Sequence, residues 1–69
     1  MQCFEGEVLR QTLFREIQAV DAGAVYDPLA LADVLSDEGI EDLATMAALG
    51  AEGLRRVAVR AVRVLPLAA

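Results

Sequence analysis

The side chains of this chain that could do chemistry are its arginines and its carboxylates, and they lie in different parts of the sequence. All eleven acidic residues and two of the six arginines fall within the first 53 positions. Residues 54–69 contain the other four arginines and no acid. Because guanidinium groups bind carboxylates and phosphates in planar, two-pronged contacts, the basic end of the chain is the first candidate for a binding surface.

Groups suited to catalysis are scarce. The chain has no histidine and no lysine, which removes the commonest general base and Schiff-base chemistry. Cys3 has no histidine to activate it, Ser36 is better explained as a helix cap, and no glycine-rich phosphate-binding loop is present. We therefore expect a protein that is not an enzyme, with no catalytic residue and no cofactor.

A cluster of carboxylates between positions 33 and 42 could suggest a metal site. Without histidine or thiolate ligands it would suit only Mg²⁺ or Ca²⁺, and it lacks the regular alternation of oxygen ligands found in an EF-hand loop. Helix capping and solvation explain the cluster, so no bound metal is expected. Its members are Asp33, Asp37, Glu38, Glu41 and Asp42.

The arginines of the basic end share one side of a predicted helix. At 100° per residue, Arg56, Arg60 and Arg63 fall together, and Arg55 flanks them. Like-charged neighbours cost about 0.2–0.5 kcal/mol each. The Glu52–Arg56 spacing and the helix dipole offset this cost, so the local energy sums to about zero and does not explain the cluster. Val59 lies among these arginines, and an apolar residue ringed by arginine is typical of a protein interface. The predicted partner-binding residues are Arg55, Arg56, Val59, Arg60, Arg63 and Tyr26.

Three kinds of contact would explain the arginine cluster. The arginines could neutralise the chain's own acidic segment 33–42, within one chain or across a dimer. They could bind an acidic or mixed surface on another protein. They could also touch DNA or an anionic membrane surface, but the net charge of −5 argues against nucleic acid as the main partner.

Tyr26 is the only tyrosine of the chain and lies in the turn sequence GAVYDP. Tyrosines in turns often anchor a partner protein. The alternative is that the ring packs over the edge of the core and leaves its hydroxyl in water.

The spacing of apolar residues predicts an all-α fold with three or four short helices. The first helix lies within residues 4–23, where Leu9, Leu13, Ile17 and Val20 fall in one arc. In the second helix, Asp27 caps the N-terminus and Pro28 occupies the first helical position, and its apolar side is formed by Leu31, Val34 and Leu35.

A third helix is expected to begin at Ser36 or Asp37 and to end at Gly50. This helix is apolar almost all round, except for the arc of Glu41, Asp42 and Thr45, which predicts a central position in the fold. The stripe consists of Ile40, Leu43, Ala44 and Ala47, with Met46 and Leu49 beside it.

The C-terminal segment is read as a fourth helix that Pro66 ends. Its apolar face consists of Leu54, Val57, Ala58, Ala61 and Leu65. A strand is the alternative because VAVRAVRV is rich in β-branched residues, although its alternation changes phase near Arg60.

Size and composition favour a homodimer. A chain of 69 residues is a single domain with a small core, yet 57% of its residues are hydrophobic and one cysteine cannot form an internal disulfide. A second copy would complete the helical bundle, and a well-packed monomer is the alternative. The residues expected in the core or the dimer interface are Leu9, Leu13, Ile17, Val20, Ile40, Leu43 and Ala47.

The sequence shows no segment suited to a membrane. The uncharged run 43–51 is far shorter than the roughly 20 residues needed to cross a bilayer. The first ten residues carry acid where a signal peptide would carry base. We therefore expect no membrane span and a cytoplasmic protein.

In length, acidity and helical periodicity the chain resembles the very small proteins that phages encode to inhibit host factors, such as the quorum-sensing anti-activators. That resemblance implies a protein that inactivates a host transcriptional regulator by binding it, and it carries over no individual functional residue. Antitoxins and other small regulatory dimers share the same features. The expected function is stoichiometric binding that inhibits or regulates a partner protein, and the alternative is a DNA-associated regulatory dimer such as an antitoxin or small transcription regulator.

Overall fold

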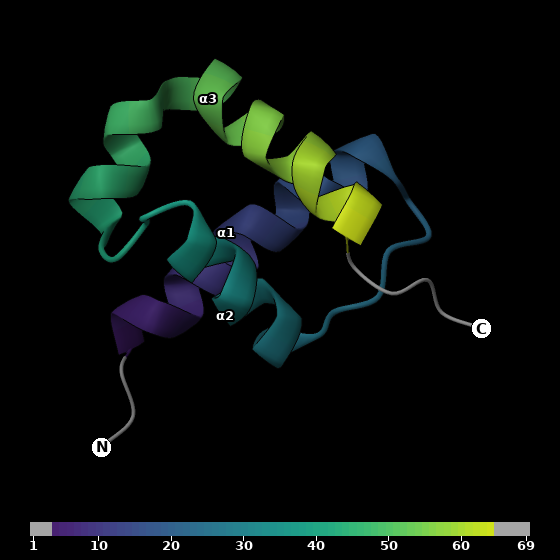
Figure 1. Cartoon of the computed structure of the whole chain (residues 1–69), viewed down its shortest axis with the longest axis horizontal. Helices are drawn as coiled ribbons and strands as arrows, with labels where there is room; N and C mark the ends of the chain where they lie inside the picture. The colour runs from purple at the N-terminus through teal and green to yellow at the C-terminus, as the bar shows by residue number, and fades with distance from the viewer. Residues whose placement is uncertain (1–3, 65–69) are drawn as a thin grey trace.

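The chain folds into three α-helices joined by two short loops (Figure 1). The computed structural model describes residues 4–64, with the side chains of 5–63. Over this part of the chain there is no strand, so the all-α prediction is confirmed and the strand alternative for the C-terminal segment is wrong. The helices are α1 (Phe4–Val20), α2 (Pro28–Asp37) and α3 (Leu43–Val64).

Helix α1 lies where the apolar spacing places it. Its first turn contains two glutamates, which the positive end of the helix dipole stabilises. Leu9, Leu13 and Ile17 are buried, whereas Val20, expected in the core or the dimer interface, is 40% exposed at the end of the helix. Beyond it, the side chain of Asp21 accepts a hydrogen bond from the Gly23 N–H at 3.1 Å and turns the chain toward α2.

Helix α2 begins with the predicted cap. Asp27 is the N-cap, and its Oδ1 accepts hydrogen bonds from the backbone N–H groups of Leu29 and Ala30 at 3.2 and 3.3 Å. Pro28 follows at the first helical position, where the missing N–H costs no hydrogen bond. Together these residues fix the direction in which α2 leaves the loop, and its apolar side is buried through Leu31, Val34 and Leu35.

The start of the third helix was predicted wrongly. Ser36 and Asp37 are the last residues of α2 and do not cap α3. Gly39 then adopts a φ of 73°, a left-handed conformation that commonly ends a helix at glycine. Ile40 is buried just beyond this turn, with its N–H bonded to the Leu35 carbonyl at 2.9 Å. Helix α3 therefore begins only at Leu43.

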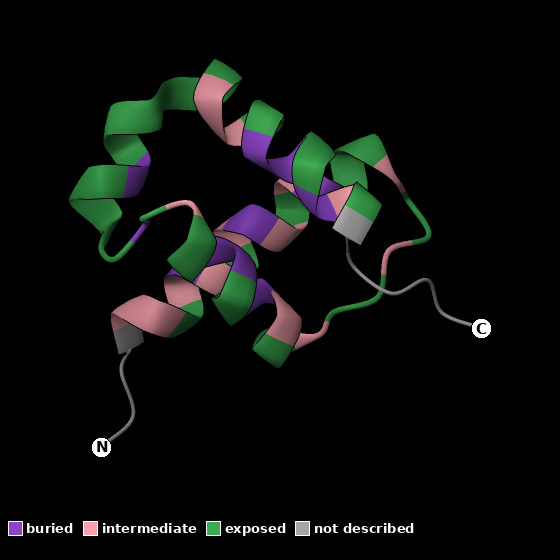
Figure 2. Cartoon of the chain, in the orientation of Figure 1, coloured by how far each residue is buried: buried purple, intermediate pink, exposed green. Residues whose placement is uncertain are grey.

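Helix α3 is broken at Gly50, whose φ of 72° and ψ of 177° are not helical. The break turns a first segment (43–49) away from the direction of the second segment (51–64), as Figure 1 shows. In the first segment only Met46 is buried among the described residues, and Figure 2 shows the rest of it exposed. The predicted central position is therefore wrong: Leu43 is 42% exposed and Ala47 is also exposed, because the bend directs only Met46 at the core.

The core forms where α2 and the second segment of α3 lie next to each other and both pack against the buried stripe of α1. The second segment buries Val57, Ala58 and Ala61 and half-buries Leu54, as its apolar face predicts, while Leu65 and Pro66 lie outside the described residues. The buried residues are Leu9, Leu13, Ile17, Leu31, Val34, Leu35, Ile40, Met46, Val57, Ala58 and Ala61.

Candidate protein-binding surface

The side of α3 that points away from the core carries an ordered row of four residues, which we call the outer face of α3: Glu52, Arg56, Val59 and Arg63. Their spacing of four, three and four residues keeps them within an arc of about 60° on a helix. All four are exposed, and Val59 leaves 37% of its surface to solvent. The buried row of the same helix lies opposite, so the core cannot cover this face.

Two of the predicted partner-binding arginines are engaged within the chain. Arg55 Nε donates to Glu16 Oε1 of α1 at 2.8 Å, and Arg60 Nη1 donates to both carboxylate oxygens of Glu38 at 3.0 and 3.2 Å. Both arginine side chains remain more than half exposed, so each pair contributes at most about 1 kcal/mol. Their effect is to hold the second segment of α3 against α1 and the end of α2.

Only one of these pairs involves the acidic segment 33–42, because Glu16 lies far from it in the sequence. The sequence reasoning did not identify Glu16. A signal existed: on the helical wheel Glu16 flanks the buried row of Leu13 and Ile17, which is where a charged side chain can reach the helix packed against α1.

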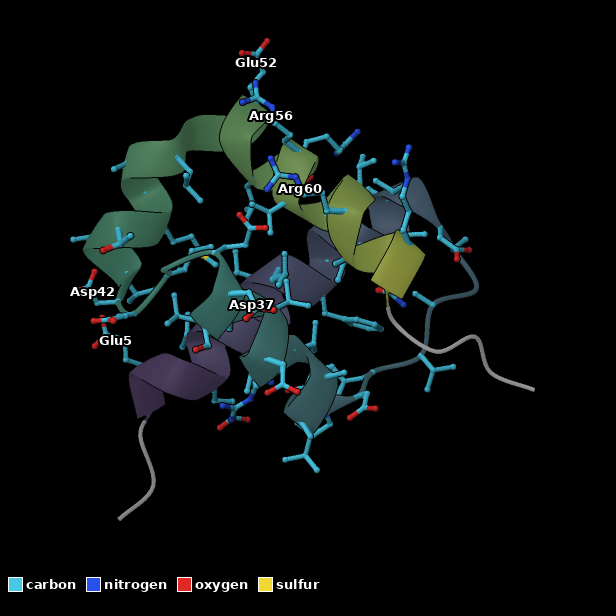
Figure 3. The ribbon with its side chains drawn as sticks, viewed as in Figure 1. Glu5, Asp37, Asp42, Glu52, Arg56 and Arg60 are labelled. Carbon is cyan, nitrogen blue, oxygen red and sulfur yellow. The ribbon has the colours of Figure 1, made fainter. Side chains whose placement is uncertain are left out.

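Arg56 and Arg63 form no ion pair or hydrogen bond with any residue in the described part of the chain. Glu52 is one turn before Arg56, and both lie at the same edge of the molecule in Figure 3, where Glu52 points away from the body. No ion pair joins them within 4–64. Of the four arginines of α3, two are therefore unpaired among the described residues, with an exposed valine between them. Arg10 and Arg15 of α1 form no ion pair or hydrogen bond in this part of the chain either.

The start of α3 is held by two carboxylates. Asp42 Oδ1 accepts a hydrogen bond from the backbone N–H of Thr45 at 2.8 Å, and Glu5 Oε2 of α1 accepts one from the N–H of Leu43 at 2.8 Å. Hydrogen bonds from the backbone and then the side chain of Thr45 lower the pKa of Asp42 below its ordinary value of 3.8. These contacts position the first segment of α3, and the sequence reasoning found neither.

Tyr26 packs edge-on against Phe14 of α1, with ring centroids 5.2 Å apart and ring planes at 81°. The ring is 39% exposed and borders a hollow of about 290 Å³. The residues that line this hollow belong to α1 and the following loop, and none comes from α3: Gln11, Phe14, Arg15, Gln18 and Tyr26. The structure therefore does not join Tyr26 to the outer face of α3.

A second, smaller hollow of about 150 Å³ lies where α2 meets the second segment of α3. It is lined by Val34, Asp37 and Glu38 from α2 and the turn that follows it, and by Arg60 and Ala61 from α3. The charged residues here have opposite signs, and Glu38 and Arg60 form an ion pair. The hollow marks the seam between the two helices.

Within residues 4–64 no group of three or more side chains has the arrangement of a metal site. No helix in this part of the chain combines the length and hydropathy needed to span a membrane. What the outer face of α3 offers is unpaired positive charge beside exposed apolar surface, which suits contact with a negatively charged surface. Searches against protein-family models, curated proteins and solved structures found no match to this chain.

Proposed function

We propose that the chain is a non-enzymatic protein-binding module that inhibits or regulates a partner protein by binding it stoichiometrically. The observation that carries this proposal is the pair of unpaired arginines, Arg56 and Arg63, on either side of exposed Val59. Arginine is among the residues that contribute most to protein interfaces, especially beside apolar surface that becomes desolvated.

The spacing of the charges on the outer face of α3 indicates what a partner surface must carry. Arg56 and Arg63 are seven residues apart, which is about 10.5 Å along a helix. A matching surface carries two carboxylates at a comparable separation, with an apolar group between them to cover Val59. This is an acidic or mixed surface, and a phosphate backbone offers no apolar group at that position.

We further propose that the chain is a homodimer. In the described part of the single chain, seven large apolar side chains are exposed: Val20, Val25, Tyr26, Leu29, Leu43, Leu49 and Val59. A domain of this size has a small core, so much of its apolar surface stays exposed to solvent in the single chain. A twofold dimer covers such surface with the same residues from each copy.

The biological setting that we propose follows the resemblance to small phage proteins that act on host factors. The chain would act in the cytoplasm as a quorum-sensing anti-activator, and its target would be a host transcriptional regulator. Binding would inactivate the regulator without any chemical step.

Affinity purification from the native host, followed by mass spectrometry, tests this function. The wild-type chain is expected to recover a discrete partner at near-equal stoichiometry, and R56E/R63E is expected to lose it. R15E, a single reversal, is the control for charge, because Arg15 is an exposed arginine on α1 that lies outside the proposed surface. If the folded double variant recovers the same protein as the wild type, the proposed surface is wrong.

The alternative, a DNA-associated regulatory dimer, is favoured only by the unpaired arginines themselves. DNA binding through several phosphate contacts weakens steeply with salt. A salt titration with duplex DNA therefore separates the two functions. We expect no retention of DNA at low salt, and retention that disappears toward physiological salt would favour the alternative.

A further inference from the structure

Helix α2 also has an uncovered face, which we call the outer face of α2: Leu29, Asp33 and Asp37. Leu29 is the most exposed large apolar residue in the described part of the chain, at 79%. Asp33 and Asp37 are exposed, and neither forms an ion pair or hydrogen bond with another described residue. The buried side of α2 lies away from Leu29 and Asp33, and Asp37 lies at the edge of this face, where it lines the hollow beside α3.

The outer faces of α2 and α3 are complementary. One presents two unpaired carboxylates and a leucine. The other presents two unpaired arginines, Arg56 and Arg63, and a valine, with a single carboxylate, Glu52, at its N-terminal end. Opposite charges on facing surfaces select a partner and fix its orientation. Apolar side chains at the centre of such a contact gain from the exclusion of water.

The two faces cannot meet within one chain. Each helix buries its opposite side against α1, so both faces point outward. The Arg60–Glu38 ion pair and the hollow beside Asp37 join the end of α2 to the second segment of α3. The two faces are therefore held in a fixed relation on either side of one seam.

We propose that the outer face of α2 in one copy binds the outer face of α3 in a second copy, and that the reverse contact forms at the same time. This inference rests on the proposed homodimer and specifies its interface. The two contacts are related by a twofold axis, as expected for a dimer in which each copy offers the same patch. The interface pairs opposite charges, and so it lets a chain with a net charge of −5 associate with itself despite the general repulsion between like-charged molecules.

The same arginines serve the proposed target and the second copy, so the two complexes exclude one another. A target then needs a face that resembles the outer face of α2, with two carboxylates beside an apolar side chain. Dimer formation would keep the arginines covered until such a target is present.

Charge reversal on each face tests the interface by sedimentation equilibrium over a range of concentrations. The wild-type chain is expected to be a dimer. R56E/R63E places acid opposite Asp33 and Asp37, and D33R/D37R places base opposite the arginines. Each variant alone is expected to weaken the dimer at least about tenfold per reversed pair.

An equimolar mixture of the two variants provides the decisive measurement. In the mixed dimer one contact has its wild-type charges and the other has both signs reversed, so both contacts are attractive. We expect the mixture to regain the mass of a dimer. Both variants keep a net negative charge, so bulk attraction between them cannot produce this result.

E7R/E41R is the matched control for D33R/D37R, because it makes the same charge change at two exposed residues outside the proposed interface. It is expected to dimerise like the wild type and to give no rescue when mixed with R56E/R63E. Circular dichroism checks that every variant is folded.

Each contrary result has a separate meaning. A wild-type chain that is monomeric at all concentrations overturns the homodimer and this interface with it. Dimers that persist in both folded variants, or variants that fail to recover on mixing, overturn the interface alone. Target binding is measured independently, and its absence overturns the proposed function without bearing on the dimer.

Discussion

The Arg60 guanidinium binds Glu38 through a single nitrogen, with Nη1 at 3.0 and 3.2 Å from the two carboxylate oxygens. This contact ties the second segment of α3 to the turn that ends α2. The arginines of α3 thus divide into those that form ion pairs within the described chain and those that form none. Arg55 belongs to the first group through its contact with Glu16, and Arg56 and Arg63 belong to the second.

Replacement of Glu38 by glutamine tests the structural role of this ion pair. Because the Arg60 side chain is 62% exposed, solvent screens the pair, and E38Q is expected to lower the free energy of unfolding by about 0.2–1 kcal/mol. Urea denaturation measures the change. E41Q, at an exposed glutamate with no ion pair to any described residue, is the control and should have a smaller effect. An equal loss in both variants would contradict a specific role for the pair.

Substitution of Gly50 by alanine tests how strongly the break in α3 depends on a glycine at this position. Its φ of 72° and ψ of 177° are nearly exclusive to glycine, and a side chain there costs about 1–3 kcal/mol of strain. No heavy atom lies within 4 Å of a Cβ added at this position, so G50A is expected to destabilise the fold by that amount through the backbone alone. Thermal and urea unfolding measure it. G23A, whose added Cβ meets only an ordinary contact 3.6 Å from Asp21, should stay near the wild type, and a G50A variant as stable as G23A would argue against the break.

Substitution of Met46 by alanine tests whether this side chain holds the first segment of α3 against the core. It is the only buried residue in 43–49, and removal of a buried methionine side chain typically costs about 2–5 kcal/mol. M46A is expected to fall at the low end of that range and to speed amide hydrogen exchange in 43–49 more than in the second segment. L49A removes a side chain that is 37% exposed and should have a smaller effect. Uniform exchange changes along both segments would contradict local attachment through Met46.

Asp42 gives the stability of the fold a dependence on pH. Its pKa is lowered in the folded chain by the hydrogen bonds from Thr45, so folding favours the ionised carboxylate. The stabilisation is complete above the ordinary pKa of 3.8 and is lost as the pH falls through the lowered folded value. D42N keeps a capping oxygen but cannot ionise at this position.

The measurement for Asp42 is the difference in unfolding free energy between the wild type and D42N across a pH series. We expect this difference to be constant near neutrality and to change in favour of D42N as the pH falls below 3.8. E41Q is the control, because Glu41 is exposed and forms no hydrogen bond or ion pair with another described residue. A pH-independent difference between wild type and D42N would show that the capping charge does not contribute.

The parts of the fold that sequence predicts are those fixed by local spacing. Leu9, Leu13 and Ile17 recur at helical intervals, and the pair Asp27 and Pro28 is an unambiguous start signal. Both features specify their helices without reference to the rest of the chain, and both helices form where these residues place them.

The parts that could not be predicted depend on choices between equivalent local signals. Ser36, Asp37 and Asp42 are all residues that cap helices well, and the left-handed turn at Gly39 decides among them. The predicted helix end at Gly50 is confirmed by its non-helical φ and ψ, but the apolar stripe before it does not show that only Met46 reaches the core. Glu38 belongs to the acidic segment that the sequence offers as a partner, and Glu16 flanks the apolar row of α1. Which arginine each of them binds is evident only when the three helices are packed together.

The hydrogen bond from the Leu43 N–H to Glu5 closes a loop across 38 positions of the chain, and this has a consequence for the order of folding. The Asp42 cap spans only three residues and can form as soon as the first turn of α3 does. The Glu5 contact must wait until α1 is in place, because closing a long loop has an entropic cost that only later contacts offset. E5Q is therefore expected to accelerate unfolding while leaving the folding rate nearly unchanged, so that this end of α3 is the last part of the chain to be secured and the first to be released.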